Sequence, residues 1–131
     1  LMDDLINEHD TAIILITHDM GVVTELADDV VVMYMGNIVE SGTVDEVLRT
    51  PAHPYTKALL HSIPVLGRGK QQEIEPIRGS TPDPYNRPKG CQFMPRCDFA
   101  TDECLQMPED TVLEGNHRAR CWRATEVIED V

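Results

Sequence analysis

The chain has 131 residues, enough for one domain or for parts of two, and its 23 acidic and 11 basic residues give a formal net charge of −12. This excess of negative charge repels nucleic acid and argues against a DNA- or RNA-binding role. The longest apolar run, residues 30–35, is too short to cross a bilayer. The sequence shows no basic-apolar leader that would indicate secretion into an oxidising compartment, so the four cysteines are interpreted as thiols.

The first elements expected are a helix end and a buried strand. Residues 1–7 carry apolar side chains on one helical face, and no initiator Met stands before them. We therefore expect the chain to be a fragment whose start lies inside a helix. Residues 12–16, with the sequence AIILI, are rich in β-branched side chains, which is typical of a strand buried on both faces of a parallel sheet.

His18 stands directly after this expected strand. In open α/β sheets, functional groups collect beyond the carboxyl ends of the strands, and an imidazole can donate or accept a proton near neutral pH. The position therefore makes His18 a candidate functional residue, although a histidine there is more often an ordinary turn residue.

A capped helix and a hairpin should follow. Asp19 is suited to cap a helix, because apolar residues recur after it at helical spacing. Residues 30–35 predict a second strand and residues 38–40 a returning strand. Gly36-Asn37 between them predicts a tight two-residue turn.

Two short helices are expected next. Thr43 and Glu46 form the pattern of a capping box at the start of a helix that covers residues 44–49. Pro54 suits the first turn of a second helix, which should run to about residue 62. His53 precedes that helix as a possible ligand or catalyst, but a surface or capping role is the more ordinary interpretation.

From residue 65 to residue 90 the composition changes. Glycine and proline punctuate this segment and apolar residues are sparse, which is typical of a linker or an extended arm. Ile74 and Ile77 are the expected points of attachment to the rest of the protein.

The remaining stretch has too few apolar residues to build a core unaided, and small modules of this kind commonly need a staple. The candidates are its four cysteines, which have the spacing C-x5-C-x6-C-x16-C: Cys91, Cys97, Cys104 and Cys121. Four soft thiolates within about thirty residues suit one metal centre, because every ligand deprotonates on binding. The alternatives are two disulfides or four unrelated buried thiols.

The identity of that centre is left open by the spacing. Structural zinc sites usually contain close C-x2–4-C pairs, and none occurs here. A wider spacing suits a 4Fe-4S cubane, whose irons take one thiolate at each of four separated corners, but the tight runs of the common ferredoxins are also missing. The pattern favours an iron–sulfur cluster, with zinc as the alternative.

Several short runs of the sequence, taken together, resemble those of a known protein family. They are LITHD at 15–19, GNIVESG at 36–42, PAHPYT at 51–56 followed by ALL at 58–60, CQFMPRC at 91–97, and HRARCW at 117–122. The first two resemble the end of an ABC-type nucleotide-binding domain. The third and the cysteine tail resemble the ATPase subunits of oligopeptide and dipeptide importers, so the resemblance covers nearly the whole chain.

This resemblance implies an α/β fold, the C-terminal part of a P-loop-type ABC domain followed by a small, irregular cysteine-bearing extension. Residues 1–64 would complete the ATPase domain, residues 65–90 would link, and residues 91–131 would form the extension. His18 falls on the switch histidine, which contacts the γ-phosphate of ATP. Some members carry an iron–sulfur cluster on such a cysteine set.

For the parent protein, the resemblance implies ATP and magnesium as cofactors and ATP hydrolysis as the activity. The implied partners are a second ATPase subunit, transmembrane permease subunits and, indirectly, a peptide-binding protein, with peripheral attachment at the cytoplasmic face of the cell membrane and no nucleic acid.

The 131 residues contain no G-x-x-x-x-G-K-[ST] phosphate-binding loop, so this polypeptide by itself should neither bind ATP well nor hydrolyse it. A different class of function is also open. The chain could be a stand-alone, four-cysteine metal-binding interaction module without ATPase activity.

Overall fold

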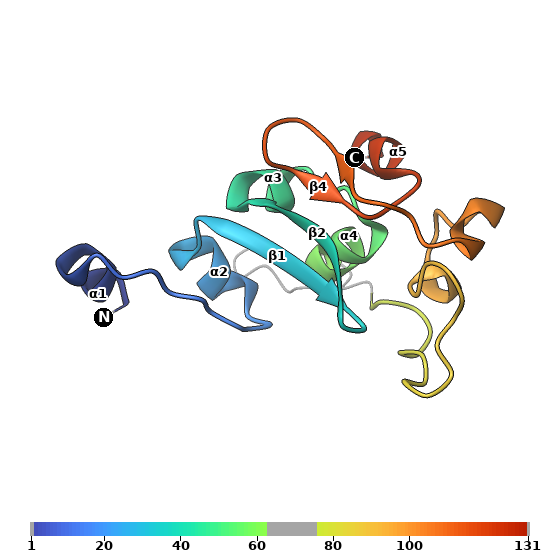
Figure 1. The fold of residues 1–131 in the computed structure, drawn as a ribbon, viewed down its shortest axis with the longest axis horizontal. Helices are drawn as coiled ribbons and strands as arrows, with labels where there is room; N and C mark the ends of the chain where they lie inside the picture. The colour runs from blue at the N-terminus through green and yellow to red at the C-terminus, as the bar shows by residue number, and fades with distance from the viewer. Residues whose placement is uncertain (1, 63–75, 131) are drawn as a thin grey trace, which may run out of the picture.

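The computed structural model describes residues 2–62 and 76–130, and it combines helices with one antiparallel sheet (Figure 1). The sheet has four strands in the order β1-β2-β4-β3. In chain order the elements are α1 (Met2–His9), α2 (Met20–Leu26), β1 (Asp29–Tyr34), β2 (Asn37–Thr43), α3 (Val44–Arg49), α4 (Pro54–His61), the 3₁₀ turns η1 (Met94–Arg96) and η2 (Asp102–Leu105), β3 (Thr111–Val112), β4 (Arg118–Ala119) and α5 (Ala124–Glu129). None of the helices in the described part of the chain is both long and apolar enough to span a membrane.

The expected strand at residues 12–16 is wrong. Residues 11–19 form neither helix nor strand, and Ile14 and Ile16 are 92% and 94% exposed. The segment connects α1 with α2 as an irregular trace (Figure 1). A strand is stable only when a neighbour pairs with its backbone groups. Among the described residues the sheet contains only β1 to β4, so no strand pairs with this apolar run.

The hairpin β1–β2 is confirmed, but its turn lies one residue earlier than expected. Tyr34 pairs with Asn37, so the two loop residues are Met35 and Gly36. Their φ angles are 51° and 80°. A type I′ turn needs positive φ at both central positions, which matches the right-handed twist of the strands. Asn37 therefore belongs to β2 rather than to the turn.

The capping box at α3 is confirmed. Glu46 N donates to Thr43 Oγ1 at 3.2 Å, and Thr43 N donates to Glu46 Oε2 at 2.8 Å. Both bonds satisfy backbone N–H groups that the first turn of a helix leaves without a partner. Asp19 likewise caps α2, because its Oδ1 accepts from Gly21 N at 2.9 Å.

Replacing Thr43 with alanine is expected to lower the free energy of unfolding by about 1 kcal/mol, because the N3 amide of α3 loses its acceptor. Urea unfolding of the chain measures this change. Thr81, which is exposed and lies outside every helix and strand, provides the matched control. A Thr43→Ala loss no larger than that of Thr81→Ala would contradict the role of the cap.

One core joins the hairpin to the cysteine-bearing segment. Phe93 is 2% exposed and packs with Tyr34, Val39 and Val47, with its ring edge-on to Tyr34 at a centroid distance of 5.3 Å. Ile77 packs against the same cluster, as expected, whereas Ile74 lies outside the described residues.

The sheet makes the same connection as the core. Strand β4, which follows the cysteine-bearing loops, pairs with Glu40 and Ser41 of β2. The front and back of the chain therefore share one sheet. The division into segments 1–64, 65–90 and 91–131 stays a prediction.

Candidate metal centre

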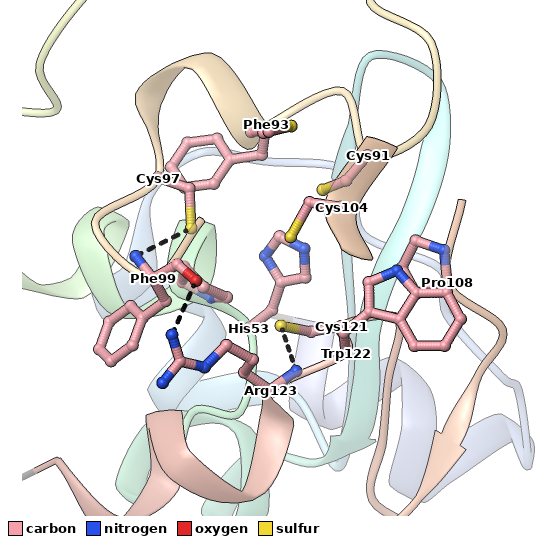
Figure 2. Close-up of a pocket in the computed structure, with 12 residues that line it drawn as sticks. His53, Cys91, Phe93, Cys97, Phe99, Cys104, Pro108, Cys121, Trp122 and Arg123 are labelled. Atoms are coloured by element: carbon pink, nitrogen blue, oxygen red, sulfur yellow. Dashed lines mark hydrogen bonds between the residues drawn. The ribbon is translucent and has the colours of Figure 1, made fainter. Parts of the chain in front are cut away.

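The four cysteines line one cavity. Cys91 and Cys97 flank η1, Cys104 lies in η2, and Cys121 lies between β4 and α5. The empty space that they surround, including its open mouth, is about 320 Å³. Figure 2 shows the four sulfur atoms around this space, with the ring of His53 among them. All four cysteines are free thiols, so neither of the two disulfides is present.

Short backbone contacts hold the two cysteine loops together. Cys91 N donates to Cys104 O at 2.9 Å, which joins the first loop to η2. Gly90, just before it, has a φ of 76°, and a Cβ there would lie 2.4 Å from the carbonyl of Leu105. Only glycine allows this approach, since any side chain would collide with backbone that cannot move aside. Gly90 thus allows Cys91 and Cys104 to face one cavity.

Two backbone amides point at cysteine sulfurs. Phe99 N donates to Cys97 Sγ at 3.3 Å, and Arg123 N donates to Cys121 Sγ at 3.4 Å. A hydrogen bond to sulfur favours the thiolate over the thiol, because it stabilises the negative charge. The local turns are therefore arranged to support a thiolate ligand at two of the four positions.

Burial opposes that charge when nothing is bound. Desolvation, together with smaller repulsion from the other cysteines around the cavity, raises the pKa of Cys97 to about 12 and that of Cys121 to about 11. The pKa of Cys91 is raised for the same reason. At neutral pH these groups are thus protonated, and a metal that binds them must displace protons.

The donor set fits a thiophilic centre, because four sulfurs share one cavity. In the described ranges, no three side chains among His, Cys, Asp and Glu lie close enough to hold a single metal ion. Tetrahedral zinc would draw all four sulfurs to about 2.3 Å from one point. A larger centre accepts one thiolate at each of several separated atoms.

His53 lies against the same cavity and caps α4. Its Nδ1 accepts from Tyr55 N at 3.0 Å, which confirms the expected capping role. The alternative of a surface position is wrong, because the residue is 1% exposed. Desolvation lowers the pKa of His53 to about 4, so the ring is neutral at neutral pH.

Glu40 is a buried acceptor of three hydrogen bonds, a role that its place in the sequence does not predict. Its Oε1 accepts from Ala52 N at 2.8 Å and from His117 Nε2 at 2.6 Å, and its Oε2 accepts from His53 N at 3.1 Å. The residue is 1% exposed. The only signal in the sequence was a carboxylate within an otherwise apolar returning strand. Glu40 fixes the backbone of His53, which stands beside the cysteines.

His18 does not line this cavity. It is exposed and lies in the segment between α1 and α2, immediately before the cap residue Asp19. Asp19 N donates to Thr17 Oγ1 at 3.0 Å, so the backbone on both sides of His18 is held by a local turn. The structure therefore separates the two sites expected from sequence.

Comparison with known proteins gives a family and several close relatives. The family described as "Oligopeptide/dipeptide transporter, C-terminal region" matches residues 39–104, about half of the chain. The oligopeptide transport ATP-binding protein AppD of Bacillus subtilis is 47% identical over 123 residues, which cover 93% of this chain and 37% of AppD. The oligopeptide transport ATP-binding protein OppD of Haemophilus influenzae is 41% identical over 126 residues, which cover 96% of this chain and 39% of OppD.

The dipeptide transport ATP-binding protein DppD of Haemophilus influenzae is also similar, at 44% identity over 110 residues. The aligned part covers 84% of this chain and 33% of DppD. The chain thus spans between about a third and two fifths of the length of these curated relatives.

Proposed function

The chain belongs to the oligopeptide/dipeptide transporter C-terminal region family, and we propose from this membership that its parent protein is the ATP-hydrolysing subunit of an ABC importer of peptides. The observation that carries the proposal is the match of nearly the whole chain to transport ATP-binding proteins at 41–47% identity. The alternative of a stand-alone metal-binding module is not supported, because these matches extend over the hairpin and α3 as well as the cysteine loops.

In the parent, ATP and magnesium are the cofactors and His18 acts at the γ-phosphate. Phosphoryl transfer to water depends mainly on positioning and on stabilising charge. An imidazole held by a short turn has the reach to contact a phosphate oxygen and to orient the attacking water. The Asp19 cap and the bond of Asp19 N to Thr17 support this role, because they hold the backbone beside His18.

The partners in this proposal are a second ATPase subunit, transmembrane permease subunits and, through them, a peptide-binding protein. The parent would sit peripherally at the cytoplasmic face of the membrane. Cells that lack the gene are expected to lose uptake of a labelled peptide and to regain it when the full-length gene is restored. Unchanged uptake after deletion, in cells with no second peptide importer, would contradict the assignment.

For the cysteine cavity we propose a 4Fe-4S cluster held by Cys91, Cys97, Cys104 and Cys121, with zinc as the alternative. Two observations support it: four thiols around one cavity, and amide donors on two of the sulfurs. Such a cluster would cross-link loops that share little apolar core. It would also supply a one-electron redox couple.

Full-length protein prepared without oxygen is expected to contain about four irons and four sulfides per chain. Replacing Cys104, the buried ligand, with serine should remove most of the bound iron, because a hydroxyl is a poor soft ligand. Metal and acid-labile sulfide analysis measures both quantities. The control is Met107→Ser, at an exposed sulfur-bearing residue in the same loop that does not line the cavity. Zinc without sulfide in the unaltered protein would instead establish the alternative.

A further inference from the structure

His53 has one ring nitrogen whose partner the structure does not supply. Nδ1 accepts the hydrogen bond from Tyr55 N, so in the neutral ring the proton sits on Nε2. Among the described residues, Nε2 makes no hydrogen bond. The ring is nevertheless almost fully buried, and it forms part of the cavity wall together with the four cysteines (Figure 2).

Nε2 is not one of the fully buried polar atoms that lack a partner in the described residues, so it keeps access to open space, and its ring lines the cavity. One neighbour of the ring is Phe93, at a centroid distance of 5.9 Å, and its side chain offers no strong acceptor. Because the ring lines the cavity, the cavity is a place where Nε2–H can find an acceptor. Among the side chains that line the cavity, those of the four cysteines offer the strongest acceptors once they are deprotonated.

The backbone of His53 is held in place as firmly as its ring. Its amide donates to the buried carboxylate of Glu40 at 3.1 Å, and its ring is tied to the first turn of α4. While Nε2 carries its proton it cannot ligate a metal, because its lone pair belongs to the aromatic system of the ring.

We propose that His53 is a positioning residue for the cysteine-bound centre, and that its Nε2–H donates a hydrogen bond to a sulfur of that centre. The inference rests on the metal centre proposed above and adds a residue to it. Hydrogen bonds to the sulfurs of an iron–sulfur cluster stabilise the more negative, reduced form and raise the reduction potential. His53 would thereby both orient the centre and set its potential.

Two substitutions separate the donor from the cap. His53→Asn places an amide oxygen where Nδ1 stands, so it keeps the cap of α4 but has no group at the position of Nε2. His53→Gln reaches that position with its amide nitrogen and keeps a donor there, but it gives up the cap. Redox titration of the full-length protein, followed by the electron paramagnetic resonance signal of the reduced cluster, measures the potential of each.

The His53→Asn protein is expected to hold its cluster and to show, at a fixed ambient potential, a ratio of reduced to oxidised cluster about tenfold below that of the unaltered protein. For a one-electron couple this corresponds to about 59 mV. The His53→Gln protein is expected to titrate close to the unaltered protein. Loss of the cluster in His53→Asn but not in His53→Gln would also support the donor, since it would show that binding depends on it.

Equal potentials in all three proteins would overturn the inference, and so would loss of the cluster in both variants, which would mark a purely structural side chain. An unaltered protein without iron and sulfide would overturn the cluster proposal itself, which the metal analysis detects before any titration. The two failures are therefore distinguishable.

Discussion

Full-length parent protein in which His18 is replaced by alanine is expected to hydrolyse ATP at least about a hundredfold more slowly, while its dissociation constant for ATP changes little. In the proposed role, the imidazole would contribute mainly when charge builds on the γ-phosphate and water attacks it. An interaction made chiefly in the transition state lowers the rate constant without weakening ground-state binding.

Steady-state ATPase assays and equilibrium binding of a labelled nucleotide measure the two quantities separately. His9→Ala is the matched control, because His9 is also exposed and stands at the end of α1. A merely structural role for His18 would lower both binding and rate. Equal turnover by the His18→Ala and unaltered proteins would remove the assignment.

Replacing Glu40 with alanine is expected to lower the free energy of unfolding by about 3–5 kcal/mol. The change removes the acceptor for the amides of Ala52 and His53 and leaves His117 buried at 3% exposure without its carboxylate. Three buried donors would then be unsatisfied at once. The loss also frees the backbone of His53 at the wall of the cysteine cavity.

Urea unfolding followed by circular dichroism measures this loss. Glu109→Ala, at an exposed carboxylate in the same acidic chain, should stay within about 0.5 kcal/mol of the unaltered protein. Glu40→Gln should fall between the two, because the amide keeps one acceptor oxygen but turns an NH₂ group toward another donor. A Glu40→Ala loss below 1 kcal/mol would show that the network is not a principal support of the fold.

The elements that the sequence predicted correctly are those whose hydrogen bonds close within a few residues. Thr43 and Glu46 are three residues apart, and Asp19 caps amides two and three residues on. Pro54 starts α4 where its missing N–H costs nothing. Such patterns carry their own partners, so they can be recognised without knowledge of the tertiary structure.

The predictions that were wrong depended on partners elsewhere. The apolar run at 12–16 has the composition of a buried strand, but a strand needs a neighbour, and the described residues place none beside it. The turn at Met35 was missed because Gly36-Asn37 has the stronger turn composition, whereas the register of the whole hairpin set the loop one residue earlier.

The candidate metal site could also be predicted only in part from the sequence. The four cysteines were visible from residue type and spacing, because soft ligands in one short stretch are rare without a centre to bind. The place of His53 at the cavity wall could not be predicted, since PAHPYT shows a histidine before a helix but not what its side chain lies against. The sequence also did not predict the pairing of β4 with β2, which brings Cys121 back toward the loop that carries Cys91.

The sequence by itself determined the helix caps, the hairpin, the set of thiols and the family to which the chain belongs. Only the tertiary structure decided that Glu40 would accept from residues 12, 13 and 77 positions away, and that His53 would stand at the cavity of the cysteines. The physical reason is the range of the contacts. Short-range hydrogen bonds follow from local spacing, whereas a buried carboxylate finds its partners only after distant segments have packed around it.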